Sequence, residues 1–323
     1  MRRNASVLVL WVIGILLGGT LAAAAETRGG TVRAQMELNQ NFYYVGDPLS
    51  VRVVISNTGS AEVSNPIKGD LFTAFSVSDA AGKRLEPGSK AEAQEPARPP
   101  KLAPNALYGG VVDLAKMYPQ LRSTGRFTIK WSANGVAADD ISVTIITKMD
   151  PKKDYAARVE TEQGTFVIDL FKKTAPIAVK AFADLANAGF YDGLLIHEAI
   201  GNQLIGGGDP TGTGRGQAPL RYPAELGAVP IVVGSVLMKP AGLAPPANSS
   251  QFIVALQPQS AWIGQFTVVG QVVEGLEVVR KLSNLPTADP PSHKPLKDVH
   301  TLRVAIEEKA SVPAPAAPAP SKP

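Results

Sequence analysis

The sequence predicts a mainly β protein with two domains. Short runs in which apolar and polar residues alternate recur along most of the chain, and turn residues separate them. Helical spacing is limited to two segments, at residues 174–189 and 276–282. The chain has 323 residues, of which 45% are hydrophobic and 19% charged, which is enough for two ordinary hydrophobic cores.

Composition excludes several classes of function. The chain has no cysteine, so it has no disulfide, no thiol nucleophile and no cysteine metal site. Its 32 basic and 28 acidic residues give a net charge of +4, and these charges are dispersed along the chain. A nucleic-acid-binding surface requires a stronger and more clustered positive charge, so no nucleic-acid partner is expected.

Residues 1–25 have the pattern of a secretory signal peptide. Two arginines precede an apolar run over residues 7–17, and small residues end in three alanines at Ala25. An uncleaved anchor is the alternative, because residues 5–25 approach the roughly 20 residues that a membrane-spanning helix needs. Both interpretations predict an exported protein, periplasmic or extracellular, that meets the membrane only if the leader is not cleaved.

Residues 31–148 are predicted to form a β-sandwich. Alternation in this segment is clear, turn signals such as 57–59 separate the runs, and helical periodicity is weak. The segment resembles immunoglobulin-like domains of exported bacterial proteins. The alternating runs occupy residues 32–38, 49–55, 127–131 and 141–145.

The sequence changes character after a predicted linker at residues 149–156. Residues 157–308 are predicted to form the second domain, and residues 309–323 a flexible tail of Pro, Ala, Ser and Lys. A hairpin is followed by a helix that Thr174 is expected to cap and Pro176 to begin. The expected strands occupy residues 157–161, 165–170, 234–238, 251–256, 266–272 and 302–306.

A glycine-rich segment at residues 190–216 organises this second domain. Its glycines do not have the spacing of a phosphate-binding loop, and no strand-to-helix switch follows them. Together with residues 162–165 and 248–252, it resembles the cyclophilin family of peptidyl-prolyl cis-trans isomerases. The resemblance implies a closed antiparallel β-barrel of eight strands with two capping helices. It also implies proline-containing polypeptides as partners, and neither a cofactor nor a metal.

Cyclophilin chemistry makes no covalent intermediate. An X-Pro bond isomerises over a barrier of roughly 18–20 kcal/mol because amide resonance resists twisting. In the family, an apolar pocket holds the proline ring, a Gln and backbone groups fix the peptide, and an Arg donates a hydrogen bond to the prolyl nitrogen. Stabilising the twisted bond more than the planar bond accelerates the reaction.

The resemblance transfers to this chain unevenly. The family's Gln is kept as Gln251, whereas the position of the catalytic Arg is occupied by Glu198. Gly212 and Trp262 match the family. This chain differs from the family at the remaining substrate-binding positions. Gln203 and Leu204 replace the family's Phe-Met pair, Gly206 replaces Gln, Ile253 replaces Phe, Ile263 replaces Leu, Phe266 replaces His, and Lys239 and Pro240 replace the Ala-Asn pair.

Two functions follow from this pattern. The first is an exported isomerase that assists folding of exported polypeptides, with weak activity because a carboxylate at Glu198 cannot donate to the prolyl nitrogen. The alternative is a non-catalytic peptide-binding or scaffolding module with a degenerate barrel. Arg215 or Arg221 is a hypothetical substitute donor. His197 is expected to be a packed or surface histidine, and Asp209 to cap a turn.

Overall fold

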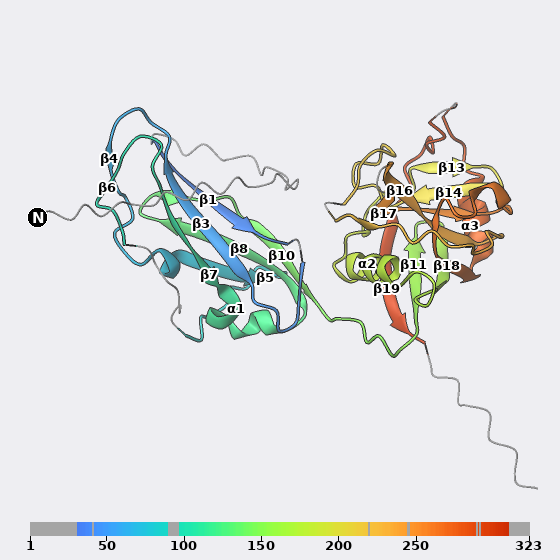
Figure 1. Ribbon diagram of the computed structural model, residues 1–323, viewed down its shortest axis with the longest axis horizontal. Helices are drawn as coiled ribbons and strands as arrows, with labels where there is room; N and C mark the ends of the chain where they lie inside the picture. Colours follow the sequence, from blue (N-terminus) through green and yellow to red (C-terminus); the bar gives the residue numbers. More distant parts are fainter. Residues whose placement is uncertain are drawn as a thin grey trace, which may run out of the picture.

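The structure is a computed structural model that describes residues 31–40, 42–89, 97–218, 220–243, 246–288, 290 and 292–309 (Figure 1). The predicted signal peptide, residues 1–25, and the tail after residue 309 lie outside these residues. The described strands form two groups, one that ends before residue 147 and one that begins after residue 154.

The first group consists of two main sheets. In the three-stranded sheet β3 lies between β1 and β7, and in the other sheet β10 and β8 lie between β2 and β5. Neighbours on these paths are antiparallel except β2 and β10, which run parallel. The strands are β1 (Val32–Leu38), β2 (Phe42–Tyr44), β3 (Ser50–Asn57), β5 (Phe75–Asp79), β7 (Leu107–Asp113), β8 (Gly125–Ala133) and β10 (Ile141–Ile146). Shorter elements are β4 (Val63–Ser64), β6 (Lys101–Leu102), β9 (Val136–Ala137) and helix α1 (Leu114–Met117).

Alternation along the strands explains why these sheets pack face to face. In β3, Val53 and Ile55 are buried while Arg52 is exposed, and β8 buries Ile129 and Trp131 in the same hydrophobic core. The Trp131 indole Nε1 donates to the main-chain oxygen of Leu71 at 2.8 Å, so its one polar atom is satisfied inside the core.

The second group forms one antiparallel sheet in the order β13-β14-β17-β16-β18-β12-β11-β19, with β15 paired to β17 (Figure 1). Its inner face carries the main core, which includes Phe166, Phe182 and Phe252. The strands are β11 (Tyr155–Thr161), β12 (Gly164–Leu170), β13 (Glu198–Ile200), β14 (Leu204–Gly207), β15 (Tyr222–Pro223), β16 (Ser235–Leu243), β17 (Pro246–Ala255), β18 (Thr267–Glu274) and β19 (Thr301–Glu308).

The predicted closure of this sheet is wrong. The end strands β13 and β19 do not pair, so the sheet is an open half-barrel. Residues 194–196, which precede β13, meet residues 299–301 at the start of β19 instead. The Thr301 amide donates to the Leu194 oxygen at 2.8 Å, and the Ile196 amide donates to the Val299 oxygen at 2.9 Å.

Both predicted helices are confirmed as α2 (Pro176–Asn187) and α3 (Leu276–Ser283). Pro176 begins α2 as expected, but the predicted cap is wrong, because Thr174 donates its hydroxyl to the Phe171 oxygen. The first amides of α2 are satisfied by Glu225 instead, whose carboxylate accepts from Ile177 at 3.2 Å and Ala178 at 2.8 Å. Over the described ranges, no helix is both long and apolar enough to cross a membrane.

Replacing Glu225 by alanine is expected to lower the free energy of unfolding by about 1–2 kcal/mol, because two helix amides lose a charged acceptor. Thr174→Ala is the matched control, with an expected change below about 0.5 kcal/mol. Chemical denaturation of both variants measures the difference. Equal stability of the two variants would contradict the assignment of the cap to Glu225.

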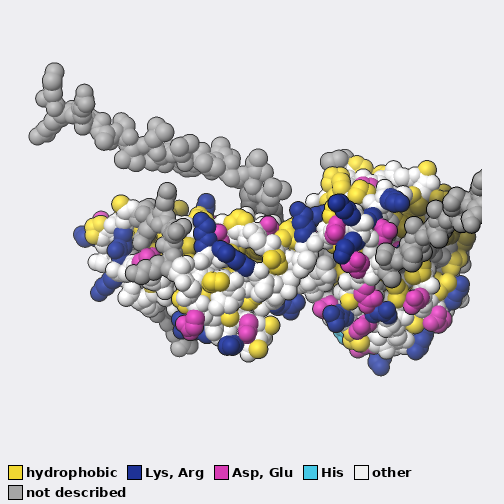
Figure 2. All heavy atoms as spheres, turned by 90° about the horizontal axis from the view of Figure 1, so that it is seen from below, with side chains coloured by type: hydrophobic (Ala, Val, Ile, Leu, Met, Phe, Trp, Pro, Cys, Tyr) yellow, Lys and Arg dark blue, Asp and Glu magenta, His cyan; other side chains and the backbone are white. Residues whose placement is uncertain are grey.

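The two groups of strands touch through a polar contact. The Tyr44 hydroxyl on β2 donates to the Asp184 carboxylate on α2 at 2.5 Å, and the Lys180 ammonium contacts both groups. The Arg126 guanidinium donates to the Ala188 oxygen at 3.5 Å. The space-filling view shows the two parts in contact (Figure 2).

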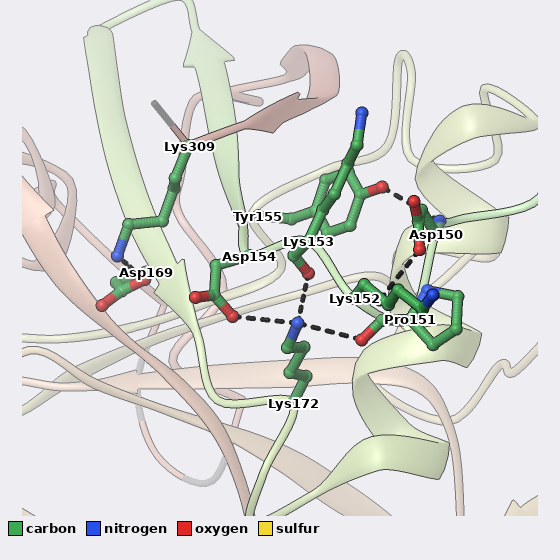
Figure 3. A network of polar contacts seen from close by, with 9 residues as sticks. All are labelled: Asp150, Pro151, Lys152, Lys153, Asp154, Tyr155, Asp169, Lys172 and Lys309. Atoms are coloured by element: carbon green, nitrogen blue, oxygen red, sulfur yellow. Dashed lines mark hydrogen bonds and ion pairs between the residues drawn. The ribbon is translucent and has the colours of Figure 1, made fainter. Parts of the chain in front are cut away.

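The segment that connects β10 to β11 is fastened by one lysine side chain (Figure 3). The Lys172 ammonium lies 3.0 Å from the Asp154 carboxylate and donates to the Pro151 oxygen at 3.1 Å and to the Lys153 oxygen. The Asp150 amide donates to the Tyr155 hydroxyl at 3.0 Å. These bonds hold the connection against the second part of the protein.

Candidate functional site

The outer face of the half-barrel carries a second apolar cluster. Successive residues of a strand point to opposite faces, so Phe252 and Val254 on β17 enter the main core, whereas Ile253 and Ala255 point outward. The outer apolar cluster consists of Leu204, Ile231, Leu237, Ile253, Ala255 and Val268. Two of the predicted pocket residues, Leu204 and Ile253, therefore lie together.

Two aromatic side chains extend this outer apolar cluster. Trp262 and Phe266 pack against it, with ring centroids 5.0 Å apart and ring planes at 34°. Both rings are partly exposed. The neighbouring Ile263 is more exposed, at 39%, and lies at the margin of the outer apolar cluster. Val229 packs there as well. Val229 and Ile231 are not among the predicted pocket residues, although the apolar run at residues 229–233 could have indicated them.

Glu198 lies on the same face. It is opposite Gly206 in the β13–β14 ladder, and Gly206 is opposite Ile253 in the β14–β17 ladder, so the three positions form one row. A Cβ atom at Gly206 would lie 3.0 Å from the Glu198 Oε2, so the carboxylate lies over the glycine. The Lys239 Nζ is 3.9 Å from the same oxygen and partly neutralises it.

Gln251 holds the glycine-rich segment and offers a free acceptor. Its Nε2 donates to the main-chain oxygens of Gly214 at 3.1 Å and Gly216 at 2.5 Å, which fixes the orientation of the amide. Its Oε1 is buried and has no hydrogen-bond partner among the described residues. Gln251 also lines a cavity of about 70 Å³ together with Gly214, Arg215, Gln217, Lys239, Pro240 and Ser249.

Three predicted residues lie apart from these groups. Gly212 is buried against Leu195, with φ of +65° and room for no Cβ, since one would meet the Leu195 Cδ1 at 2.8 Å. Gln203 is exposed in the turn before β14. The third, Ile263, lies at the exposed margin of the outer apolar cluster and is not part of it.

Asp209 fixes the turn of the glycine-rich segment, as predicted. Its carboxylate accepts from the Thr211 amide at 2.7 Å and the Thr213 amide at 3.0 Å. Burial alone would raise the pKa of Asp209, but hydrogen bonds from Thr211 and from the Gly216 and Gly214 backbone lower it below the ordinary value. Asp209 is therefore a structural anion and not an acid catalyst.

His197 is buried, which agrees with the first of the two predicted alternatives, a packed or a surface histidine. Neither ring nitrogen has a partner in good hydrogen-bond geometry among the described residues. Burial lowers the pKa of His197, and the nearby Asp209 only partly opposes this shift. Across the ranges that the structure describes, no three His, Asp or Glu side chains lie close enough to hold a metal ion.

The lowered pKa of His197 predicts a loss of stability on acidification. As the pH falls through the ordinary value of 6.5, the unfolded chain binds a proton at His197 that the folded protein does not bind. The free energy of unfolding should therefore fall by up to about 1.4 kcal/mol per pH unit between that value and the lower folded pKa. Denaturation of the wild type and His197→Gln at pH 7 and pH 5.5 measures this, and identical slopes would contradict it.

Comparison with known proteins identifies the family. Residues 156–306 match the family model described as cyclophilin type peptidyl-prolyl cis-trans isomerase/CLD. The chain is 31% identical over 151 residues to peptidyl-prolyl cis-trans isomerase CYP18-2 of Arabidopsis thaliana. The aligned region covers 46% of this chain and 91% of that protein. It is 36% identical over 148 residues to peptidyl-prolyl cis-trans isomerase-like 1 of Mus musculus, which covers 45% of this chain and 88% of that protein.

A crystal structure of a cyclophilin-type isomerase from Cryptosporidium parvum aligns with 49% of this chain and 99% of its own, with a TM-score of 0.46 and 28% identity. The sequence relatives show that the chain belongs to the cyclophilin-type peptidyl-prolyl cis-trans isomerase family through residues 156–306. The family prediction is confirmed.

Proposed function

We propose that the outer apolar cluster binds the proline ring of polypeptide substrates and that the protein isomerises them weakly. The observation that supports this most is the position of Gln251 beside that cluster. Ile253 follows two residues later on the same face of β17, and Trp262 and Phe266 extend the apolar surface. The Gln251 Oε1 is unpaired among the described residues but buried, so it accepts a peptide N–H of the substrate once the side chains that line the neighbouring cavity of about 70 Å³ move aside.

Weak activity follows from the chemistry of Glu198. The twisted amide in the transition state places a lone pair on the prolyl nitrogen, and a donor there stabilises it. An ionised carboxylate has no proton to donate, and its charge opposes the lone pair. Among the described residues, the Lys239 ammonium, 3.9 Å from Glu198, and the exposed Arg215 are the two cationic side chains that line the cavity of about 70 Å³ beside Gln251.

A second candidate function is peptide binding without catalysis. Glu198 favours it, because the Lys239 ammonium is drawn to the carboxylate and away from a substrate nitrogen. The apolar surface for a proline ring does not depend on this pair. Binding without acceleration would therefore identify a peptide-binding module.

Gln251→Ala is expected to weaken binding of an Ala-Pro peptide and to lower its isomerisation rate by about tenfold, because a fixed acceptor is lost at about 1–1.5 kcal/mol. Exchange NMR with the wild type, Gln251→Ala and the exposed control Gln35→Ala measures both quantities. A Gln251→Ala variant that behaves like Gln35→Ala would contradict the proposed role.

We also propose that the protein is exported and acts on exported polypeptides. The support is the leader pattern at residues 1–25. Terminal sequencing of protein purified from the producing cells tests this proposal. A mature chain that begins at Glu26 would agree with cleavage, and an intact Met1 in a cytoplasmic fraction would contradict export.

The N-terminal part is proposed to be an immunoglobulin-like domain. Its support is the pairing of β1-β3-β7 in one sheet and β2-β10-β8-β5 in the other, around one core. A domain of residues 31–148, a linker at 149–156 and a domain of residues 157–308 would then fold as separate units. Limited proteolysis should cut first near residues 149–154, which precede β11, and first cleavage inside either sheet would contradict these boundaries.

A further inference from the structure

The last strand of the half-barrel has a free edge. Among the described strands β19 pairs only with β11, because the sheet does not close. The beginning of this edge is covered, since the Thr301 amide donates to the Leu194 oxygen at 2.8 Å and its oxygen accepts from the Gly193 amide at 2.7 Å. No described strand covers the edge beyond that point.

The register shows which backbone groups point to the free edge. The Lys309 amide donates to the Asp154 oxygen at 2.9 Å, so Lys309 points toward β11. Backbone groups alternate in an antiparallel pair, so Glu307 also points toward β11, whereas Ile306 and Val304 point away. The Val304 amide agrees with this, because it donates outward to the Asp192 carboxylate at 3.4 Å. Among the described residues, the N–H and C=O of Ile306 have no backbone partner and point to the free edge.

This edge lines an open cavity of about 670 Å³ between the two parts of the protein. Residues 303–306 form one wall together with residues 186–189 at the end of α2, and residues 144–149 and 124–126 line the cavity from the N-terminal part. The contact between Tyr44 and Asp184 fixes the two walls relative to each other, and Lys172 fastens the connection. The cavity is therefore formed before any ligand binds.

Charge in the cavity is mainly positive. Arg126, Lys148 and Arg303 contribute cations, and Asp192 is the one acidic residue among the described residues of the lining. The Asp192 carboxylate already accepts the Val304 amide. A ligand in this cavity meets strand donors and acceptors on one side and a net positive charge from the lining residues.

We propose that this cavity is a second polypeptide-binding site, in which an extended acidic segment adds a strand to β19. An exposed strand edge recognises any extended backbone through main-chain hydrogen bonds, and neighbouring side chains provide selectivity. Here the neighbouring side chains favour Glu and Asp in the bound segment. The site is independent of the proline-binding face, because β19 does not contribute to the outer apolar cluster.

The test uses the full chain and a proline-free probe, the acetylated and amidated peptide Glu-Val-Glu-Thr-Glu-Val. Titration followed by amide NMR should shift the signals of Ile306 and Thr147 and protect the Ile306 amide from hydrogen exchange. A Lys-Val-Lys-Thr-Lys-Val peptide should bind at least about fivefold more weakly, because each lost or reversed surface charge pair contributes up to about fivefold. Equal binding of the two peptides would overturn the charge assignment.

Backbone methylation tests strand addition without changing the protein. In an added strand, only every second residue forms backbone hydrogen bonds with β19. N-methylation of those peptide residues should weaken binding at least about tenfold, and N-methylation of the residues between them should not weaken it. Arg303→Gln should weaken binding about two- to fivefold, and the exposed strand control Arg52→Gln should leave it unchanged. Both variants should retain wild-type activity on an Ala-Pro peptide. No shift at Ile306, or equal loss with both methylated sets, would overturn the proposal and leave the proposed isomerase function untouched.

Discussion

Replacing Glu198 by arginine together with Gly206 by glutamine is expected to raise kcat/KM on an Ala-Pro peptide by about a hundredfold or more, the range attributed to one well-placed donor. Glu198 shares a row with Ile253, so an arginine at this position reaches the outer apolar cluster. A Cβ at position 206 would lie 3.0 Å from the Glu198 Oε2 and 3.1 Å from the Glu198 Cβ, so a glutamine there displaces the side chain of residue 198 away from β14. The arginine is thereby directed toward the bound proline.

Two controls separate this effect from charge alone. Glu198→Gln removes the negative charge but adds a weaker donor, so its rate should fall between the wild type and the double variant. Glu277→Arg makes the same change of charge on α3 and should leave the rate unchanged. A double variant that binds the peptide as the wild type does, and is no faster, would show that position 198 does not face the prolyl nitrogen.

Trp131→Ala is expected to lower the free energy of unfolding of the N-terminal part by about 3–5 kcal/mol. The indole is 1% exposed, so its removal leaves a cavity between the two sheets. It also leaves the Leu71 oxygen without the donor that now lies 2.8 Å away. Trp262→Ala is the matched control, because Trp262 is only partly buried at the outer apolar cluster.

Denaturation followed by circular dichroism measures the stability of both variants, and peptide titration measures their binding. Trp131→Ala should lose stability and keep peptide binding, whereas Trp262→Ala should keep most of its stability and lose binding. The opposite pattern would contradict both the packing of the sandwich and the location of the binding face.

Local patterns in the sequence were sufficient to predict ten of the 19 described strands and the two longer helices, α2 and α3. Alternation at residues 49–55 and 127–131 predicts β3 and β8, because each strand buries every second residue. Pro176 marks the beginning of α2 because its missing amide is tolerated there. These features depend on neighbours within a few residues.

Features that depend on distant residues were not predictable. Glu225 caps α2 from about fifty positions away, which no cap pattern in the sequence indicates. The failure of β13 and β19 to pair depends on loop geometry and not on alternation. The contact between Tyr44 and Asp184 joins residues 140 positions apart.

The candidate site was predicted through the family resemblance and not through local patterns. Leu204 on β14 and Ile253 on β17 share one face, and the segment between β17 and β18 brings Trp262 and Phe266 against them. The pairing of Glu198 with Lys239 was not expected, because each position was compared with the family separately. Glu198 and Lys239 both differ from the family residues at their positions, and their opposite charges are compatible with each other because the two side chains are neighbours.

The most direct test of the proposed function is an NMR titration of the wild-type protein with an Ala-Pro peptide, with the exchange rate of the peptide bond measured in the same samples. We expect shifts at Ile253, Trp262 and Phe266 and a small acceleration that Glu198→Arg with Gly206→Gln increases. Shifts confined to other surfaces, or none at saturating peptide, would contradict a proline-binding site on the outer face of the half-barrel.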